Sequence, residues 1–167
     1  EYLEIKNSIQ NGISMNPGSY ISTANYIIQN CNIHDNGVKH PTAEGITVSG
    51  SNIKIRNVLI NNVGGDGVYF KGNNVEIGYN TISNVSRYGD IESGGNGDGI
   101  EEGSGFESEN VWVHHNTINS DNIGKGCIMI TDSVNAVIEY NICSGGRIGI
   151  NTSESIDFIC RYNTVIK

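Results

Sequence analysis

The sequence predicts an all-β fold, a parallel β-helix whose short strands coil around one axis and stack coil upon coil. A repeated phrase, its period-2 alternation and the glycine-rich turns between copies together predict this fold. The phrase is an asparagine, alternating apolar residues, then a second asparagine before a Thr-Ile or similar pair, and clear copies begin at Asn74, Asn110, Asn135 and Asp157. Such a repeat indicates a solenoid, because each copy can bury its apolar side chains only against the next.

The spacing of the copies sets the size of one coil. Asn52 and Asn74 are 22 residues apart, as are Asn135 and Asp157. A second strand phrase follows each opening residue, at 44–48, 66–70, 98–102, 126–130 and 148–152. Strands this short, with no helical period, favour a β-helix over a leucine-rich-repeat horseshoe. We therefore predict about seven coils of about 22 residues in a single domain spanning residues 1–167.

Equivalent positions of successive coils should stack into columns at the strand spacing of about 4.8 Å. Two inward columns hold Val75, Val111, Ala136 and Phe158, then Ile77, Val113, Ile138 and Cys160. The second asparagines form a ladder of Asn80, Asn116, Asn141 and Asn163. The residues just before them form an aromatic file of Tyr79, His115, Tyr140 and Tyr162. Amide ladders and cross-strand ring pairs stabilise stacked strands, so we assign both a structural role.

Composition limits the classes of function. The formal charge is −8, and 10 Lys and Arg residues are few for binding a phosphate backbone, so we expect no nucleic-acid partner. No apolar run approaches the length of a membrane span. The cysteines contain no Cys-x-x-Cys pair, which predicts buried free thiols rather than a disulfide or zinc framework. Both ends fall inside strand phrases, so we expect a piece of a longer protein, with further domains or end-to-end self-association.

The repeat resembles that of the right-handed parallel β-helix proteins, the pectate-lyase-like superfamily, over nearly the whole chain. The resemblance lies in the strand phrases, such as those beginning at Asn74 and Asn110, and not in a catalytic signature. It implies a right-handed coil in an extracellular or cell-surface protein that cleaves, epimerises or binds polysaccharides, or is only structural. The phrasing is also similar to the repeat region of archaeal disaggregatases, which degrade a cell-surface polysaccharide. The Asn-Thr-Asp, Asp-Asp and Gly-His-Gly signatures of polygalacturonases are absent.

Two insertions flank the plain coil at 52–73. Five extra residues near 34–42 precede this coil, and ten extra residues near 86–96 follow it. Both insertions fall at the same turn position of their coils. Functional sites in solenoids tend to lie where insertions interrupt the regular coils. We expect the insertions to form two walls of a cleft whose floor is coil 52–73.

Acidic residues line this predicted cleft. Glu44, Asp66 and Asp98 precede the second strand on three successive coils, and Glu101 lies beside them in an outward column. Carboxylates should be about 5 Å apart on neighbouring coils and about 9.6 Å apart two coils away, near the separations in retaining and inverting glycosidases. Like charges this close should raise one pKa, as a general acid requires, and the stack could equally hold Ca²⁺. Asp before Gly is also an ordinary turn pair, so a structural role is the third interpretation.

Further side chains around the cleft are candidates for contacts with substrate. They are Tyr69, Lys71, His34, His40, Arg87 and Tyr88. Tyr69 could stack on a sugar ring, and Lys71 or Tyr69 could take a proton from a uronate. Strict alternation points Glu102 inward, so either it is a buried acid with a perturbed pKa or a bulge at 103–106 turns it out. The four extra residues there favour the bulge.

These observations favour an extracellular polysaccharide-degrading enzyme that binds its substrate in the cleft. Asp66, Asp98, Glu44 and Glu101 would supply acid and base, and hydrolysis is favoured over β-elimination because the cleft is more acidic than basic. No cofactor is required, although Ca²⁺ could bridge an acidic polymer. The alternative is a non-catalytic module that binds glycans or spaces domains within a cell-surface protein.

Overall fold

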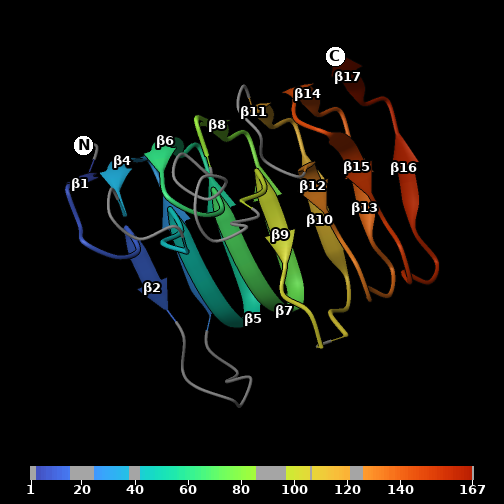
Figure 1. Ribbon diagram of the computed structural model, residues 1–167. Coiled ribbons are helices and arrows are strands. Elements are labelled where there is room, and N and C mark those ends of the chain that lie inside the picture. Colours follow the sequence, from blue (N-terminus) through green and yellow to red (C-terminus); the bar gives the residue numbers. More distant parts are fainter. Residues whose placement is uncertain are drawn as a thin grey trace.

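The chain winds repeatedly around one axis, so that strands distant in sequence lie side by side (Figure 1). The computed structural model describes residues 3–15, 25–37, 42–85, 97–105, 107–120 and 126–166, and these form strands and turns with no helix among them. Neighbouring strands pair in parallel. Within these ranges no helix is long and apolar enough to cross a membrane. The prediction of an all-β parallel β-helix is confirmed.

One wall of the solenoid is a seven-stranded sheet. Its strands in order are β1 (Leu3–Lys6), β4 (Cys31–Asn36), β6 (Leu59–Val63), β8 (Thr81–Ser83), β11 (Thr117–Ser120), β14 (Ile142–Gly145) and β17 (Thr164–Ile166). The predicted count of about seven coils was too high, because seven stacked strands enclose fewer than seven complete turns.

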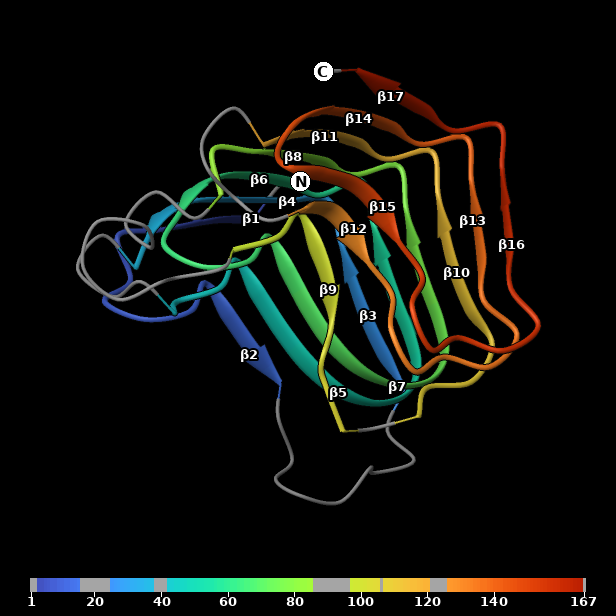
Figure 2. The same cartoon turned by 45° about the vertical axis from the view of Figure 1, so that its right-hand side comes forward.

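A ten-stranded sheet forms the rest of the wall (Figure 2). On one side it contains β2 (Ile13–Met15), β9 (Ile100–Glu102), β12 (Gly126–Met129) and β15 (Ile148–Asn151). On the other side it contains β3 (Tyr26–Gln29), β10 (Val111–His114), β13 (Val137–Glu139) and β16 (Ile159–Arg161). Two long strands, β5 (Ile46–Arg56) and β7 (Val68–Gly78), run through both sides and join them.

The corner between the two sides needs glycine. Gly50 of β5 pairs with Gly72 of β7, and a Cβ atom built on Gly72 would lie 1.7 Å from the Gly50 carbonyl oxygen. Any other residue would force the two coils apart at this point. The glycines therefore allow one strand to continue around the corner without a break in pairing.

The predicted inward columns form the core. Val75 pairs with Val111, and Ile77 pairs with Val113, which in turn pairs with Ile138. All five are buried inside the solenoid. In the last described coil the inward residues Phe158, Cys160 and Val165 are exposed, since no described coil packs over them. Alternation along the strands thus places these side chains as predicted, and burial follows wherever a neighbouring coil covers them.

The asparagine ladder and the aromatic file are both confirmed. The Nδ2 groups of Asn80, Asn116 and Asn141 each donate to the Oδ1 atom of the next asparagine, the last being Asn163, at 2.9–3.0 Å. Rings of the aromatic file stack with centroid separations of 4.8–5.0 Å. Because each ring covers the face of the next, the file is a packing feature of the wall.

A second amide ladder explains why the repeat phrase opens on asparagine. Asn52, Asn74, Asn110 and Asn135 have positive φ between 56° and 58°, a conformation that asparagine tolerates better than most residues. Their side chains are exposed and hydrogen-bond from coil to coil at 2.9–3.4 Å, beginning at Asn25. The sequence pattern located these positions, but the ladder itself was not predicted.

The cysteines are free, as predicted. Cys31, Cys127 and Cys143 are buried, whereas Cys160 is exposed in the last described coil, so the prediction of burial was wrong for that thiol. Most of the two predicted insertions lies outside the described residues, at 38–41 and 86–96. The cleft that they were expected to flank stays a prediction.

Candidate functional site

The acidic residues before the second strand stack on successive coils. The Gly45 amide donates to the Asp66 carbonyl at 2.8 Å, and the Gly67 amide donates to the Asp98 carbonyl at 2.9 Å. Glu101 of β9 pairs with Tyr69 of β7 in the outward column beside them. The backbone register therefore places the acids in the column that the spacing predicted.

Three of the carboxyl groups converge. Asp66, Asp98 and Glu101 each offer one oxygen atom, and these oxygen atoms all lie within 4.8 Å of one another. We call these three residues the acid cluster. The Asp66 and Asp98 residues are only 7% and 2% exposed, while Glu101 is half-buried and reaches the surface. The cluster thus has two sheltered carboxyl groups behind one that solvent can reach.

The sheltered position of Asp66 controls its protonation. Its Oδ1 atom accepts a hydrogen bond from the Asp98 amide at 2.7 Å. Burial, and next the negative charge of Glu101, raise the pKa of Asp66 well above the ordinary range of an aspartate. The Asp66 carboxyl also lies close to that of Asp98, whose negative charge raises the pKa of Asp66 further. Asp66 therefore keeps its proton to a higher pH than an ordinary aspartate does, as a general acid requires.

Glu44 occupies the same column but does not join the acid cluster. Its Oε2 atom accepts a hydrogen bond from the Thr47 hydroxyl at 3.1 Å, and its amide donates to the Asn11 side chain at 3.0 Å. Burial raises the pKa of Glu44. The cluster itself is Asp66, Asp98 and Glu101.

Tyr69 and Lys71 lie beside the acid cluster and fold over Gly103. A Cβ atom built on Gly103 would lie 2.1 Å from Lys71 Cε and 2.3 Å from the Tyr69 hydroxyl. The Lys71 ammonium donates to the Ser104 carbonyl at 3.0 Å and lies 5.8 Å from the centroid of the Tyr69 ring. Tyr69 is adjacent to Glu101, so it is placed for contact with a ligand there, whereas Lys71 is held by its own neighbours.

The remaining predicted contact residues are apart from the cluster or outside the described residues. His34 lies on β4 in the seven-stranded sheet, where its ring nitrogens bond to Asp35 at 2.8 Å and Glu4 at 3.0 Å. The hydrogen bond to Asp35, then that to Glu4, raises the pKa of His34. His40, Arg87 and Tyr88 lie outside the described residues.

Glu102 corrects one expectation. No bulge turns it out: Glu102 pairs in register with Phe70, points inward and is 1% exposed. Its Oε2 atom accepts from the Ser133 hydroxyl at 2.7 Å, and its Oε1 atom accepts from the Ser108 amide at 3.3 Å. Burial raises its pKa. Ser104 and Gly105 form a turn after the strand, so the alternation of β9 stays intact.

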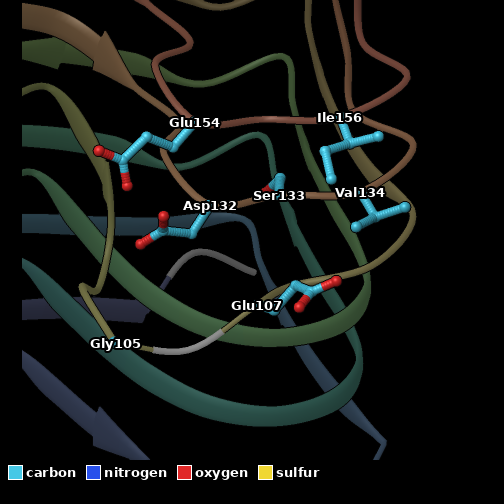
Figure 3. Close-up of a pocket in the computed structure, with 7 residues that line it drawn as sticks. All are labelled: Gly105, Glu107, Asp132, Ser133, Val134, Glu154 and Ile156. Carbon is cyan, nitrogen blue, oxygen red and sulfur yellow. The ribbon is translucent and has the colours of Figure 1, made fainter.

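A second acidic column was missed by the sequence analysis. Glu107, Asp132 and Glu154 stand on successive coils, each two residues before the bridge positions Glu109, Val134 and Ile156. A cavity of about 240 Å³ is lined by the three acids together with Gly105, Ser133, Val134 and Ile156 (Figure 3). The signal was present as a repeated tetrapeptide: Glu107-Ser-Glu-Asn, Asp132-Ser-Val-Asn and Glu154-Ser-Ile-Asp.

Comparison with known proteins identifies the repeat but no close relative. A family model described as a right handed beta helix region matches residues 44–167. No curated protein and no solved structure matches the chain.

Proposed function

Because the chain belongs to the right-handed β-helix family, we propose that it is an extracellular polysaccharide-degrading domain that hydrolyses its substrate at the acid cluster. The observation that carries the proposal is the convergence of Asp66, Asp98 and Glu101 within 4.8 Å, with a carboxyl whose pKa is raised beside one that reaches the surface. Most glycosidases use two carboxyl groups, one as general acid and the other as nucleophile or base.

The environments of the carboxyl groups support different roles. Asp66, whose pKa is raised, donates its proton to the glycosidic oxygen as the bond to the anomeric carbon breaks. Glu101 is the accessible carboxylate and attacks the anomeric carbon, and a water molecule then releases the sugar while Asp66 takes back a proton. The short separation favours this retaining course over an inverting one, which needs about 6.5–9.5 Å. Asp98 acts as a positioning residue, because its amide holds Asp66 and its charge raises the Asp66 pKa.

Hydrolysis is a better fit than β-elimination. Elimination needs a base to remove a proton from the sugar ring. The predicted candidates were Lys71, Tyr69, Arg87 and the histidines, of which Arg87 and His40 lie outside the described residues. The Lys71 ammonium is bonded to the Ser104 carbonyl, and His34 is on another sheet with both ring nitrogens engaged. Neither is presented to the acid cluster, whereas Tyr69 borders it and offers a ring for sugar stacking.

The test is incubation with a panel of neutral, amino-sugar and uronate polysaccharides, with new reducing ends and the ultraviolet absorbance of unsaturated uronates read in parallel. We expect reducing ends without that absorbance, and their loss in Asp66→Asn and Glu101→Gln. Asp157→Asn, which removes an exposed acid from the last coil, should retain full activity. Unsaturated products, or full turnover in both cluster variants, would refute the proposal.

A second candidate function is Ca²⁺-dependent glycan binding without cleavage. It is favoured by the same geometry, because three carboxylate oxygens within 4.8 Å could contribute to the six to eight oxygen ligands typical of Ca²⁺. It predicts retention on an acidic polysaccharide that is lost in a chelator, with no new reducing ends. Product formation in the presence of chelator would exclude it.

A further inference from the structure

A cavity beside the last described turns shares no lining residue with the acid cluster. We infer that it binds a primary ammonium group carried on an apolar frame, the chemistry shared by an amino sugar and a linear alkylamine. The inference goes beyond the hydrolysis proposed above and stands on the cavity, its two-sided lining and a sequence motif repeated along it.

The cavity has an acidic side and an apolar side. Figure 3 shows the carboxylates of Asp132 and Glu154 directed the same way, with Val134 and Ile156 on the other side of Ser133. A volume of about 240 Å³ is below the roughly 300–1,000 Å³ of sites for drug-sized ligands. It suits a group the size of one sugar ring or a short alkyl chain.

The serines of the repeated tetrapeptide have structural roles. The Ser133 hydroxyl donates to the buried Glu102 carboxylate at 2.7 Å, and the Ser108 hydroxyl accepts from the Gly72 amide at 3.3 Å. The Ser155 hydroxyl donates to the Ile130 carbonyl at 3.2 Å. These bonds tie neighbouring coils together behind the cavity and fix its floor, so the recurrence of serine in the motif is explained by the fold.

The acids of the motif are not explained by the fold. Among the described residues, Glu107, Asp132 and Glu154 form no hydrogen bond or ion pair through their carboxylates. Stacking like charges on successive coils is unfavourable, and Asp132 and Glu154 also hold positive φ values of 68° and 62°. A cation among the carboxylates would offset this repulsion, and the apolar side would accept its carbon frame.

A compact metal ion is a poorer fit than an organic cation. The acid cluster is the group of described residues whose oxygens converge closely enough to hold a metal ion, and the cavity residues are not part of it. The carboxylates of Asp132 and Glu154 are directed one way and that of Glu107 the other, and Val134 and Ile156 also line the cavity. An alkylammonium can use both features, since its charge meets the carboxylates while its methylene or ring carbons cover apolar surface.

Direct titration tests the inference without relying on turnover. Glucosamine and pentylamine are the two ammonium probes, and N-acetylglucosamine and pentanol are their neutral partners. We expect an ammonium probe to bind about tenfold or more tightly than its neutral partner, with affinity falling as salt is raised. The probe that binds identifies the source of the ammonium. Equal binding of charged and neutral partners, or no binding of either ammonium probe, would overturn the inference.

Variants locate the site. Asp132→Asn keeps a residue that tolerates positive φ, and with Glu154→Gln it should weaken binding by up to about fivefold for each carboxylate removed. Glu109→Gln is the matched control, because Glu109 carries the same charge two residues after Glu107, on the coil next to Asp132, but does not line the cavity. If Glu109→Gln weakens binding as much as Asp132→Asn, the probes respond to general acidity and the site is refuted.

Discussion

Replacing Asp66 by Asn should stabilise the protein near neutral pH. The substitution removes one charge from the acid cluster but keeps an oxygen that can accept the hydrogen bond from the Asp98 amide. Two carboxylates whose oxygen atoms lie within 4.8 Å repel by about 3 kcal/mol or more at an effective dielectric constant of about 20. Because Asp66 retains part of its proton, the gain in the free energy of unfolding should be smaller, roughly 1–3 kcal/mol.

The sign of the pH dependence follows from the raised pKa. Asp66 binds its proton more tightly in the folded state than in the unfolded chain, whose aspartates titrate near about 3.9. Its contribution to stability is complete below that value and is lost as pH rises through the folded-state pKa. The wild-type protein and Asp66→Asn should therefore be similarly stable at low pH and diverge as pH approaches neutrality.

Urea unfolding in the presence of a chelator measures the difference at both pH values. Asp157→Asn is the control, since it removes an exposed aspartate at positive φ and asparagine tolerates that conformation. A loss of stability in Asp66→Asn at neutral pH, or a gain equal at the two pH values, would refute the reasoning. Repeating the neutral measurement with Ca²⁺ adds a second readout, because an ion bound by the cluster would stabilise the wild type more than the variant.

Three further predictions concern the walls of the solenoid. Asn116→Ala should lower the free energy of unfolding in urea by roughly 2–6 kcal/mol, because the Asn80 amide and the Ile77 carbonyl each lose a buried partner worth about 1–3 kcal/mol. A loss below about 1 kcal/mol would contradict the structural role of the ladder. Burial lowers the pKa of His114, whose ring centroid is 3.8 Å from that of Trp112, the only tryptophan in the sequence. The tryptophan fluorescence should therefore change with a pH midpoint below about 6.5, and the free energy of unfolding should fall as pH drops through that midpoint. A midpoint above that value would contradict the prediction. Glu102→Gln should keep the wild-type melting temperature at neutral pH, since its amide oxygen can still accept the hydrogen bond from Ser133. Glu102→Ala should lower the melting temperature, because the Ser133 hydroxyl loses its buried partner. Equal losses in the two variants would show that the hydrogen bond is unimportant.

The direction of most side chains could be predicted from alternation and repeat spacing. The inward columns through Val75 and Ile77 and the ladder through Asn116 follow from a period of 2 and a coil of about 22 residues, because in-register stacking places equivalent residues together. The same logic located Asp66 and Asp98 in one column and put Glu101 beside them. These are consequences of local geometry repeated along one axis.

Burial and pairing were decided only by the tertiary structure. His114 lies on the outside of its strand, yet it is 2% exposed, because Gly78 on the neighbouring coil leaves room for its ring and Trp112 stacks on it. Glu102 points inward because the turn after it absorbs the extra residues, and its partners Ser108 and Ser133 come from later turns of the chain.

What the sequence alone determined is the coil and the facing of each strand residue, since both depend on spacing along the chain. The residues that form each site depend on which side chains of neighbouring coils are paired. Turns of unequal length change that pairing from coil to coil. The cavity beside Asp132 and the raised pKa of Asp66 arise only when coils are stacked, because neither exists within a single repeat.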